Sequence, residues 1–466
     1  MEGRREHNIA LVGETSDTHR GEERMSMKLT RIMEIAKERP KEKFTSLAHL
    51  LNEDFLKACH EELSRNKMPG DDLVTKSDYE ENLDENIAEL VRRLKAKAYR
   101  PQPVKRVYIP KPGSDKKRPL GIPAYEDKIV QMGVAKILSA VYEADFIDCS
   151  CGFRPSRGCH DALQLLNHII EHRKVNYIVD ADIKEFYQHV DHEWMLKFVG
   201  HRITDPSILQ LVARFLKSGY MERGQIQETN EGTPQGGVIS PVLANIYLHY
   251  ALDLWFEKVV RKQCRGEAYM VRYADDSVFC FQYKSDAETF YGELPERLRK
   301  FGLEIAAEKS KLIEFGRFAR EKGKKDGTGK PETFDFLGFT HYCGESRNGA
   351  FRVKRLTSRK KFKSSLLQMK EWLRRNMHEP KEILLGKLRI KLSGYNRYYG
   401  VTDNTRSVAR YFWRTTTLLQ RSLNRRSQKG NYTWDRFKRY LEKANLPKAK
   451  IYVNIYDRRS HIGYIM

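Results

Sequence analysis

The chain of 466 residues has no long apolar run and few cysteines. No stretch of about 18 apolar residues occurs, so the sequence predicts no membrane-spanning helix. The amino-terminal residues have no apolar core of a signal peptide and are too acidic for a transit peptide. The seven cysteines form no paired framework, which predicts reduced thiols. Cys149, Cys151, Cys159 and His160 lie close together, but their spacing is unusual and no second Cys-x-x-Cys pair exists, so we expect no zinc site there.

Positive charge, in contrast, is abundant and unevenly placed. The net charge is +23, which indicates a polyanionic partner, with nucleic acid first and an anionic membrane second. Between Phe351 and Gly430 there are 22 Lys or Arg residues and only 4 Asp or Glu residues. This concentration favours a binding surface over the alternative, a basic face that serves only solubility.

Hydrophobic patterning predicts a mixed α/β (α+β) chain with a succession of regions. A polar, aperiodic tail without structure is expected first, followed by apolar residues at helical spacing, by mixed strands and helices, and by a second helical region. The expected boundaries are 1–25 for the tail, 26–100 for the helical extension, 101–343 for the mixed region, 352–430 for the basic helical region and 431–466 for a short last segment. Within the mixed region we expect helices over 127–146, 160–173, 242–256 and 287–301.

A predicted hairpin over 268–281 carries two adjacent acids, Asp275 and Asp276, in its turn. Adjacent carboxylates repel each other, and Asn-Gly would serve a plain turn as well. We therefore expect a cation beside them, most simply a divalent metal. A plain turn is the alternative, and we interpret the chain's other Asp-Asp pair, Asp71-Asp72, as a loop because strand-like flanks are missing there.

A second predicted strand, over 175–183, ends in acidic residues. Alternation places Asp180 and Asp182 on one face of it. A carboxylate at this strand end, next to the hairpin that bears Asp275 93 positions later, would supply the oxygen ligands that Mg²⁺ prefers. The glycine-rich segment 232–237 lies between the two strands and allows close approach to its backbone.

Basic residues form two further patterns. Strands over 104–110 and 118–123 flank a turn rich in lysine, which would clamp triphosphate oxygens; a solvated turn is the alternative. Near the end of the basic region, arginines alternate with tyrosine, phenylalanine and tryptophan, which suits stacking and phosphate contacts on RNA, although about half of these aromatics must also belong to the core. The arginines are Arg397, Arg406, Arg410 and Arg414.

Each motif alone is weak evidence, but the ordered set of motifs is highly specific. A basic hairpin, Gly-Phe-Arg-Pro at 152–155, Asp-Ile-Lys-x-Phe-Tyr at 182–187, Gly-Thr-Pro-Gln-Gly-Gly at 232–237 and Tyr-Ala-Asp-Asp at 273–276 follow one another in this order. From about Leu29 to about Arg426 the chain resembles the bacterial group II intron-encoded reverse transcriptase/maturase.

The resemblance implies a right-hand polymerase. Fingers and palm would surround an antiparallel sheet at 101–343, after a helical extension at 26–100, and a basic three-helix thumb or X domain would follow at 352–430. Such proteins bind their own intron RNA, assist its splicing and copy it into DNA during retrohoming. The implied partners are intron RNA, an RNA template with a DNA primer, dNTPs and target DNA, in the bacterial cytoplasm and with the nucleoid when bound to DNA.

The resemblance also implies roles for individual residues. Two Mg²⁺ ions, replaceable by Mn²⁺, would bind Asp182, Asp275 and the Ile183 carbonyl, with Asp276 as supporting charge. Lys309 would stand near the departing pyrophosphate as an acid. The incoming nucleotide would contact Lys111, Arg118, Tyr187 and Gln235, and intron RNA would contact the four arginines of the basic region. Tyr187 stands where the family commonly has phenylalanine, which leaves the strictness of sugar choice open.

Many relatives carry an added DNA-binding region and a His-Asn-His endonuclease with paired cysteines. Here 40 residues follow Arg426 and no cysteine follows Cys343, so we expect no endonuclease, as in group IIC-type proteins. The segment 431–466 would then contact nucleic acid. Two other functions remain open: a splicing maturase without polymerase activity, and a domesticated reverse transcriptase in DNA repair or defence.

Overall fold

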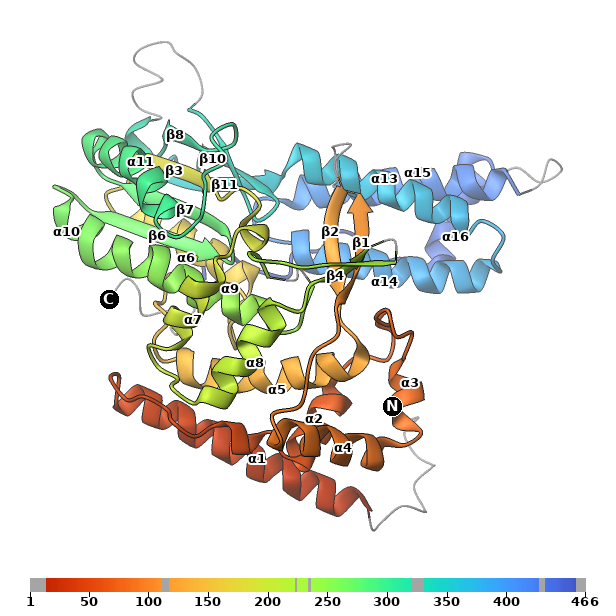
Figure 1. The fold of residues 1–466 in the computed structure, drawn as a ribbon. Helices are drawn as coiled ribbons and strands as arrows, with labels where there is room; N and C mark the ends of the chain where they lie inside the picture. Colours follow the sequence, from red (N-terminus) through yellow and green to blue (C-terminus); the bar gives the residue numbers. More distant parts are fainter. Residues whose placement is uncertain are drawn as a thin grey trace.

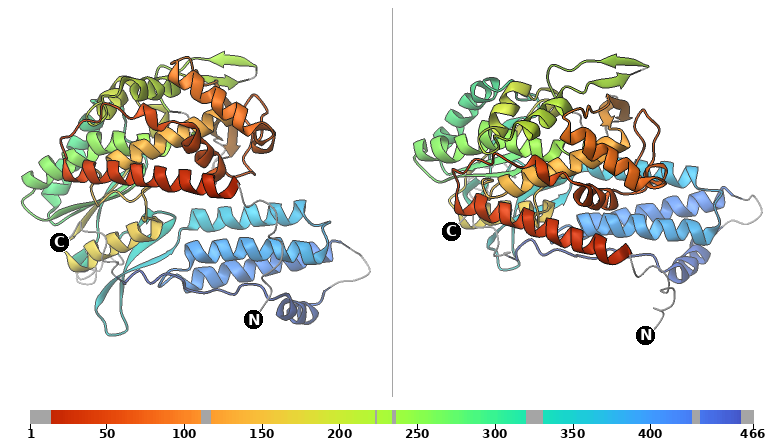
Figure 2. Two further views of the ribbon diagram at one scale, coloured as in Figure 1. Left: turned by 90° about the horizontal axis from the view of Figure 1, so that it is seen from below. Right: turned by 60° about the horizontal axis from the view of Figure 1, so that its bottom comes forward.

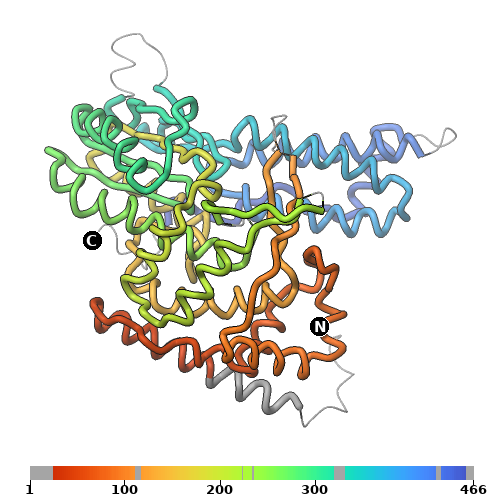
Figure 3. Tube along the Cα trace, in the orientation of Figure 1, coloured from red at the N-terminus to blue at the C-terminus, as the bar shows by residue number. Residues whose placement is uncertain are grey.

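The structure, a computed structural model, describes residues 14–110, 117–222, 224–233, 236–319, 331–426 and 432–457, with side chains from residue 25 onward. Figures 1 and 3 show helices at the amino-terminal end, mixed sheet and helix in the middle, and a layer of long helices towards the carboxyl end. No helix within these ranges is both long and apolar enough to cross a membrane.

Helices form the amino-terminal part, as the apolar spacing predicts. They are α1 (Glu14–Glu38), the short 3-10 helix η1 (Ala48–Leu50), α2 (Glu53–Glu62), α3 (Lys76–Glu80) and α4 (Leu83–Lys95). The structure is helical from residue 14, where the sequence predicted a disordered tail as far as residue 25. Tertiary packing explains the difference, because α1 lies against α2 and α5 and buries Met25 and Ala36. Residues 1–13 lie outside the described ranges.

The fingers hairpin projects from these helices. β1 (Val104–Pro110) and β2 (Lys117–Ile122) pair antiparallel, and β4 (Tyr220–Glu222) and β5 (Gln225–Gln227) complete a four-stranded sheet in the order β2-β1-β4-β5. Both predicted strands of the hairpin are confirmed. The register pairs Arg118 with Ile109, so both side chains lie on one face of the hairpin and Pro119 lies on the other.

The palm sheet has the order β6-β7-β3-β8 and is antiparallel throughout. Its strands are β3 (Tyr177–Asp182), β6 (Ala268–Tyr273), β7 (Asp276–Phe281) and β8 (Lys311–Glu314). The predicted hairpin and the predicted acidic strand are therefore confirmed, and they are direct neighbours. Helix α11 (Lys284–Arg299) packs on β3 and β7, and α6 (Cys159–His172) packs on β6 (Figure 1).

Alternate residues of the palm strands contribute to two different cores. Val179 and Phe279 belong to the first core, which includes α11 and the amino-terminal helices. Ile178 and Cys280 belong to the second core, which continues through α6 into the thumb helices. Asp180 and Asp182 have the same parity as Ile178, so the acidic residues lie on the face that is turned towards the second core.

Four more helical segments surround the palm. They are α5 (Tyr125–Tyr142), α7 (His192–Val199), α8 (Pro206–Leu216) and a long helix that starts as α9 (Ser240–Leu248). The last of these differs from the plain helix predicted over 242–256. It passes into two π-helical stretches, η3 (His249–Asp253) and η4 (Phe256–Val260), and ends as α10 (Arg261–Gln263). A π-helical turn adds a residue to the helix and rotates the side chains that follow.

The thumb follows a small antiparallel sheet of β9 (Phe334–Phe336), β10 (Phe339–Glu345) and β11 (Phe351–Thr357). Its helices α13 (Arg359–Arg375), α14 (Lys381–Tyr399) and α15 (Thr405–Asn424) lie side by side, as Figure 2 shows. Helix α16 (Trp434–Ala444) lies at the end of this layer and is strongly amphipathic.

Candidate active site

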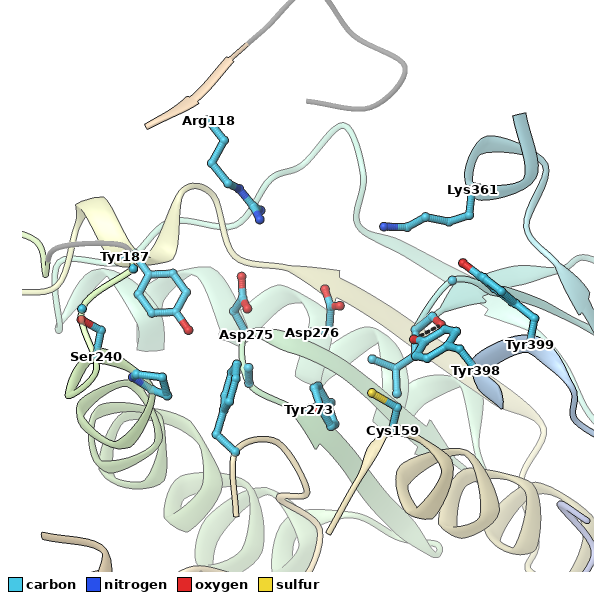
Figure 4. Close-up of a pocket in the computed structure, with 17 residues that line it drawn as sticks. Arg118, Cys159, Tyr187, Ser240, Tyr273, Asp275, Asp276, Lys361, Tyr398 and Tyr399 are labelled. Atoms are coloured by element: carbon cyan, nitrogen blue, oxygen red, sulfur yellow. Dashed lines mark hydrogen bonds between the residues drawn. The ribbon is translucent and has the colours of Figure 1, made fainter. Parts of the chain in front are cut away.

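The β6–β7 turn is the centre of the site. Tyr273 pairs with Asp276, so the loop between the strands consists of Ala274 and Asp275. Ala274 has φ of 56°, as at the first position of a type II′ turn, where glycine is usual. A residue with a side chain is strained in this conformation and needs support from its surroundings. The tight turn directs both carboxylates into the same cleft (Figure 4).

The register of the palm sheet brings the third acid to this turn. Asp182, the last residue of β3, lies directly opposite Asp276 of β7, and directly opposed side chains are close neighbours on one face. Burial raises the pKa of Asp276 to about 6, with further contributions from the negative charges of Asp275 and Asp182. Burial and the charge of Asp182 likewise raise the pKa of Asp275. The structure thus assembles three acids whose negative charges are incompletely compensated.

These acids offer suitable ligands for a divalent metal. Among the described residues, no three His, Cys, Asp or Glu side chains form a ready ligand set. The donor chemistry nevertheless fits Mg²⁺, because carboxylate oxygens with unbalanced negative charge are its preferred protein ligands. The Lys309 ammonium forms an ion pair with Asp182 and so supplies part of the missing positive charge. The Ile183 side chain is buried, and Ile183 forms an isolated bridge with Ile305.

Two predicted nucleotide contacts border the acids on the fingers side. Arg118 of β2 is exposed and points towards Asp275 (Figure 4). Tyr187 lies in the short 3-10 helix η2 (Phe186–Gln188), which follows a left-handed Glu185. Burial and the nearby charge of Asp275 raise the pKa of Tyr187 to about 12, so its hydroxyl is protonated at neutral pH and can donate a hydrogen bond. Predicted residues Lys111 and Gln235 lie outside the described residues.

The cleft has a volume of about 650 Å³ and joins fingers, palm and thumb. Arg118 and Tyr187 line it on one side, and Gly236 and Gly237 of the predicted glycine-rich segment also contribute. Sequence reasoning assigned no metal or nucleotide contact to several residues that line the thumb side and the base of the cleft. They include Phe153 of the Gly-Phe-Arg-Pro motif, Cys159, Lys361, Tyr398 and Tyr399.

Lys361 is the most informative of the missed residues. It stands in the first turn of α13, and its ammonium points towards Asp276 from the side opposite Arg118 (Figure 4). Its charge lowers the pKa of Asp276, against the larger effects that raise it. The sequence signals only a basic region around Lys361, whereas Tyr398 and Tyr399 belong to the aromatic residues noted among the arginines.

The four thumb arginines are exposed and do not line the cleft. Arg406, Arg410 and Arg414 recur every four residues on α15 and therefore share one face of that helix. Arg414 lies over the ring of Trp413, 5.2 Å from its centre, an arrangement that leaves both groups available for nucleic acid. Arg397 lies on α14.

Comparison with known proteins agrees with this geometry. The family model described as reverse transcriptase (RNA-dependent DNA polymerase) matches residues 109–341, which is half of the chain. Group II intron-encoded protein LtrA of Lactococcus lactis subsp. cremoris is 40% identical over 222 residues, covering 47% of this chain and 37% of that protein. Protein YkfC of Escherichia coli (strain K12) is 36% identical over 184 residues, covering 39% and 48%.

A eukaryotic protein also matches. The "Uncharacterized 91 kDa protein in cob intron" of Schizosaccharomyces pombe is 33% identical over 214 residues, covering 45% of this chain and 26% of that protein. The chain thus matches less than half the length of each of these relatives. The matched family model covers β2 of the fingers hairpin, the palm sheet and all three acids of the site, Asp182, Asp275 and Asp276. The chain belongs to the reverse transcriptase (RNA-dependent DNA polymerase) family.

Proposed function

We propose that the protein is an RNA-directed DNA polymerase that binds its own intron RNA, assists the splicing of that RNA and copies it into DNA. One observation carries the proposal: Asp182 meets Asp276 at the end of the palm sheet, and Asp275 and Asp276 line a cleft with cations on both sides. Family membership supports the polymerase activity, and the intron-encoded relative supports intron RNA as the partner. Such a protein would work in the bacterial cytoplasm, and at the nucleoid when bound to target DNA.

In this proposal Asp182 and Asp275 hold two Mg²⁺ ions together with the Ile183 carbonyl, and Asp276 adds negative charge. Bound there, the ions would stabilise charge on the reacting oxygens of the primer and the triphosphate. Mn²⁺ would serve as well, since it accepts the same oxygen ligands. Lys309 is paired with Asp182, so a metal ion bound by Asp182 would have to displace the Lys309 ammonium.

The fingers side of the cleft would receive the nucleotide. The Arg118 guanidinium would bind the triphosphate through charge-assisted hydrogen bonds, and Lys111 would contribute a second positive charge. Tyr187 would contact the sugar of the nucleotide, and Gln235 would be a further nucleotide contact. Lys309, once released from Asp182, can donate a proton from Nζ to the departing pyrophosphate.

The thumb side would receive the primer strand and the intron RNA. Lys361 stands across the acids from Arg118, where a backbone phosphate of the primer would find a cation. The α15 face with Arg406, Arg410 and Arg414 is separate from the cleft and would bind intron RNA, together with Arg397 of α14. Helix α16 carries basic residues and would contact DNA or RNA.

Primer extension tests the polymerase activity. The wild-type protein should extend a DNA primer on an RNA template with Mg²⁺ or Mn²⁺, and Asp275→Asn should abolish extension because an amide is a poor ligand for a hard cation. Asp71→Asn is the matched control: it changes an exposed acid of the chain's other Asp-Asp pair and should extend normally. An inactive wild-type protein, or an active Asp275→Asn variant, would contradict the proposal.

Splicing of the intron RNA tests the second activity and separates the alternatives. Asp275→Asn should still promote splicing, because RNA binding by the thumb does not need the palm carboxylates. Splicing without any wild-type primer extension would instead establish a maturase that does not polymerise. Polymerisation without any effect on splicing, from a gene with no flanking intron RNA, would indicate a domesticated enzyme of repair or defence.

A further inference from the structure

A buried ion pair lies directly behind the catalytic turn. Arg272 of β6 and Asp253 at the end of η3 are both 0% exposed. The Arg272 Nε donates to Asp253 Oδ1 at 2.7 Å, and Nη2 donates to Oδ2 at 2.5 Å. A buried ion pair is a weak source of stability, because removing two charges from water costs about as much as their attraction returns. Its presence in this place therefore calls for another explanation.

The remaining donor of Arg272 reaches the turn itself. Nη1 donates to the carbonyl of Ala274 at 2.8 Å and to Asn245 Oδ1 at 3.1 Å. Asn245 in turn donates from Nδ2 to the carbonyl of Gly152 at 2.7 Å, and Gly152 packs on the Ala274 backbone. One guanidinium thus connects a buried carboxylate with the carbonyl that immediately precedes Asp275.

The hydrogen bond from Arg272 to the Ala274 carbonyl supports the strained residue of the turn. Ala274 has a positive φ, and such a conformation persists only where the surroundings fix it. The Arg272 bond to the Ala274 carbonyl fixes the peptide that leads into Asp275. The π-helical stretch η3 ends at Asp253, so an irregular helix turn positions the partner that orients Arg272. Such π-helical turns are frequent at functional sites.

We propose that Arg272, oriented by Asp253 and Asn245, is a positioning residue that holds the Ala274-Asp275 turn in the conformation in which Asp275 can bind a metal ion. The inference rests on the proposed function, because it takes Asp275 to be a metal ligand. Both partners of Arg272 lie on the long helix that starts with α9, after the glycine-rich segment: Asn245 is in α9 and Asp253 is in η3. This helix would therefore help to position the turn.

Two variants test the positioning role. The double variant Asp253→Leu with Arg272→Met removes both charges at similar volume, a replacement that buried ion pairs often tolerate. Arg272→Lys keeps the charge beside Asp253, but a single ammonium cannot bridge the carboxylate and the Ala274 carbonyl as a planar guanidinium does. The matched control is Asp145→Leu with Arg202→Met, a largely buried Arg–Asp pair whose arginine also bonds the carbonyls of Ala36 in α1 and of Glu42 in the loop after it.

The readout is Mn²⁺ binding by the full chain with RNA template and DNA primer, measured by electron paramagnetic resonance. The Mn²⁺ bound by wild type and not by Asp275→Asn defines the site. Both test variants should bind this Mn²⁺ about 10–100-fold more weakly, the usual effect of losing a group that orients a ligand. The Mg²⁺ concentration for half-maximal extension should rise by the same factor, while affinity for primer and template stays at the wild-type value. The control pair should leave the metal dependence unchanged.

Each possible result either supports or overturns the positioning role of Arg272. A folded test variant with wild-type Mn²⁺ binding overturns the inference, and so does failure of both variants to fold, since Arg272 would then serve the fold as a whole. Arg272→Lys with wild-type binding would show that charge alone suffices, which also refutes positioning. A wild-type protein that binds no Mn²⁺ through Asp275 and extends no primer would instead refute the proposed function.

Discussion

The contact between Gly152 and the β6–β7 turn makes Gly152→Ala a sharp probe of how accurately the turn must be placed. A Cβ at position 152 would lie 2.4 Å from the Ala274 nitrogen and 3.0 Å from the Tyr273 carbonyl carbon. Both are backbone atoms, so no side chain can rotate away. Ordinary contacts begin at 3.4 Å, so the added methyl must push the turn by about 1 Å, a displacement that can cost about 100-fold in rate.

This loss corresponds to about 2.7 kcal/mol of transition-state stabilisation. Overpacking should also lower the free energy of unfolding by about 1–3 kcal/mol, which urea denaturation measures. The rate is measured in single-turnover primer extension at saturating dNTP, so that weaker nucleotide binding does not contribute. The expected result is a folded Gly152→Ala protein with a greatly reduced rate.

A second glycine provides the control. Gly292 lies within α11, and a Cβ there would meet nothing within 4 Å. Gly292→Ala should extend primers normally and gain up to about 1 kcal/mol of stability from the better helix former. A folded Gly152→Ala protein that extends primers at the wild-type rate would refute the reasoning, because the turn would then tolerate displacement.

Three further predictions concern other parts of the chain. Lys361→Ala should raise the KM for primer and template in steady-state extension and leave the KM for dNTP unchanged, because Lys361 stands on the thumb side of the cleft. Arg410→Gln with Arg414→Gln should lower the slope of log affinity against log salt by about 2 in filter binding of intron RNA, since each lost phosphate contact removes about one counterion. Burial, helped by the charge of Arg355, lowers the pKa of His341 to about 3. The unfolded chain therefore takes up this proton first, and the free energy of unfolding should fall by about 1.4 kcal/mol per pH unit between about pH 6.5 and about pH 3. His341→Phe should remove that loss from urea denaturation curves.

Each of these predictions has its own control. Lys360→Ala changes a neighbouring exposed lysine that does not line the cleft, and an equal effect of both lysines would argue against a primer contact by Lys361. Lys284→Gln changes a cation on α11 and should leave the salt slope unchanged; an unchanged slope in the double arginine variant would refute the RNA-binding face. Equal acid sensitivity of His341→Phe and wild type would show that other groups govern stability at low pH.

Local patterns in the sequence identified most of the fold and the acids of the site. Alternation placed Asp180 and Asp182 on one face of a strand, and the two runs around Asp275 and Asp276 predicted the hairpin, because both signals depend only on near neighbours. The thumb side of the cleft was not predicted, because its position depends on residues that are far apart in the sequence. Lys361 is one lysine among many, and only the tertiary packing of α13 brings it to Asp276.

Tertiary packing also explains the other differences. The segment 14–25 lacks apolar periodicity strong enough to predict a helix, yet it continues a helix whose later residues are buried against α2 and α5. The first π-helical stretch after α9 ends at Asp253, which bonds Arg272 19 positions further along the chain. No periodicity of 3.6 residues can indicate such a stretch.

The palm sheet's second core has a consequence for how such a protein can evolve. Ile178, Val278 and Cys280 pack in the same core as Leu388 and Tyr411 of the thumb. A chain truncated before the thumb would therefore lose the cover of one face of its palm sheet. Deletion of the thumb would expose this apolar face to water, so it would destabilise the palm as well. Substitutions at individual sites are therefore a less disruptive route by which one part of such a protein can lose its activity than deletion of the whole region.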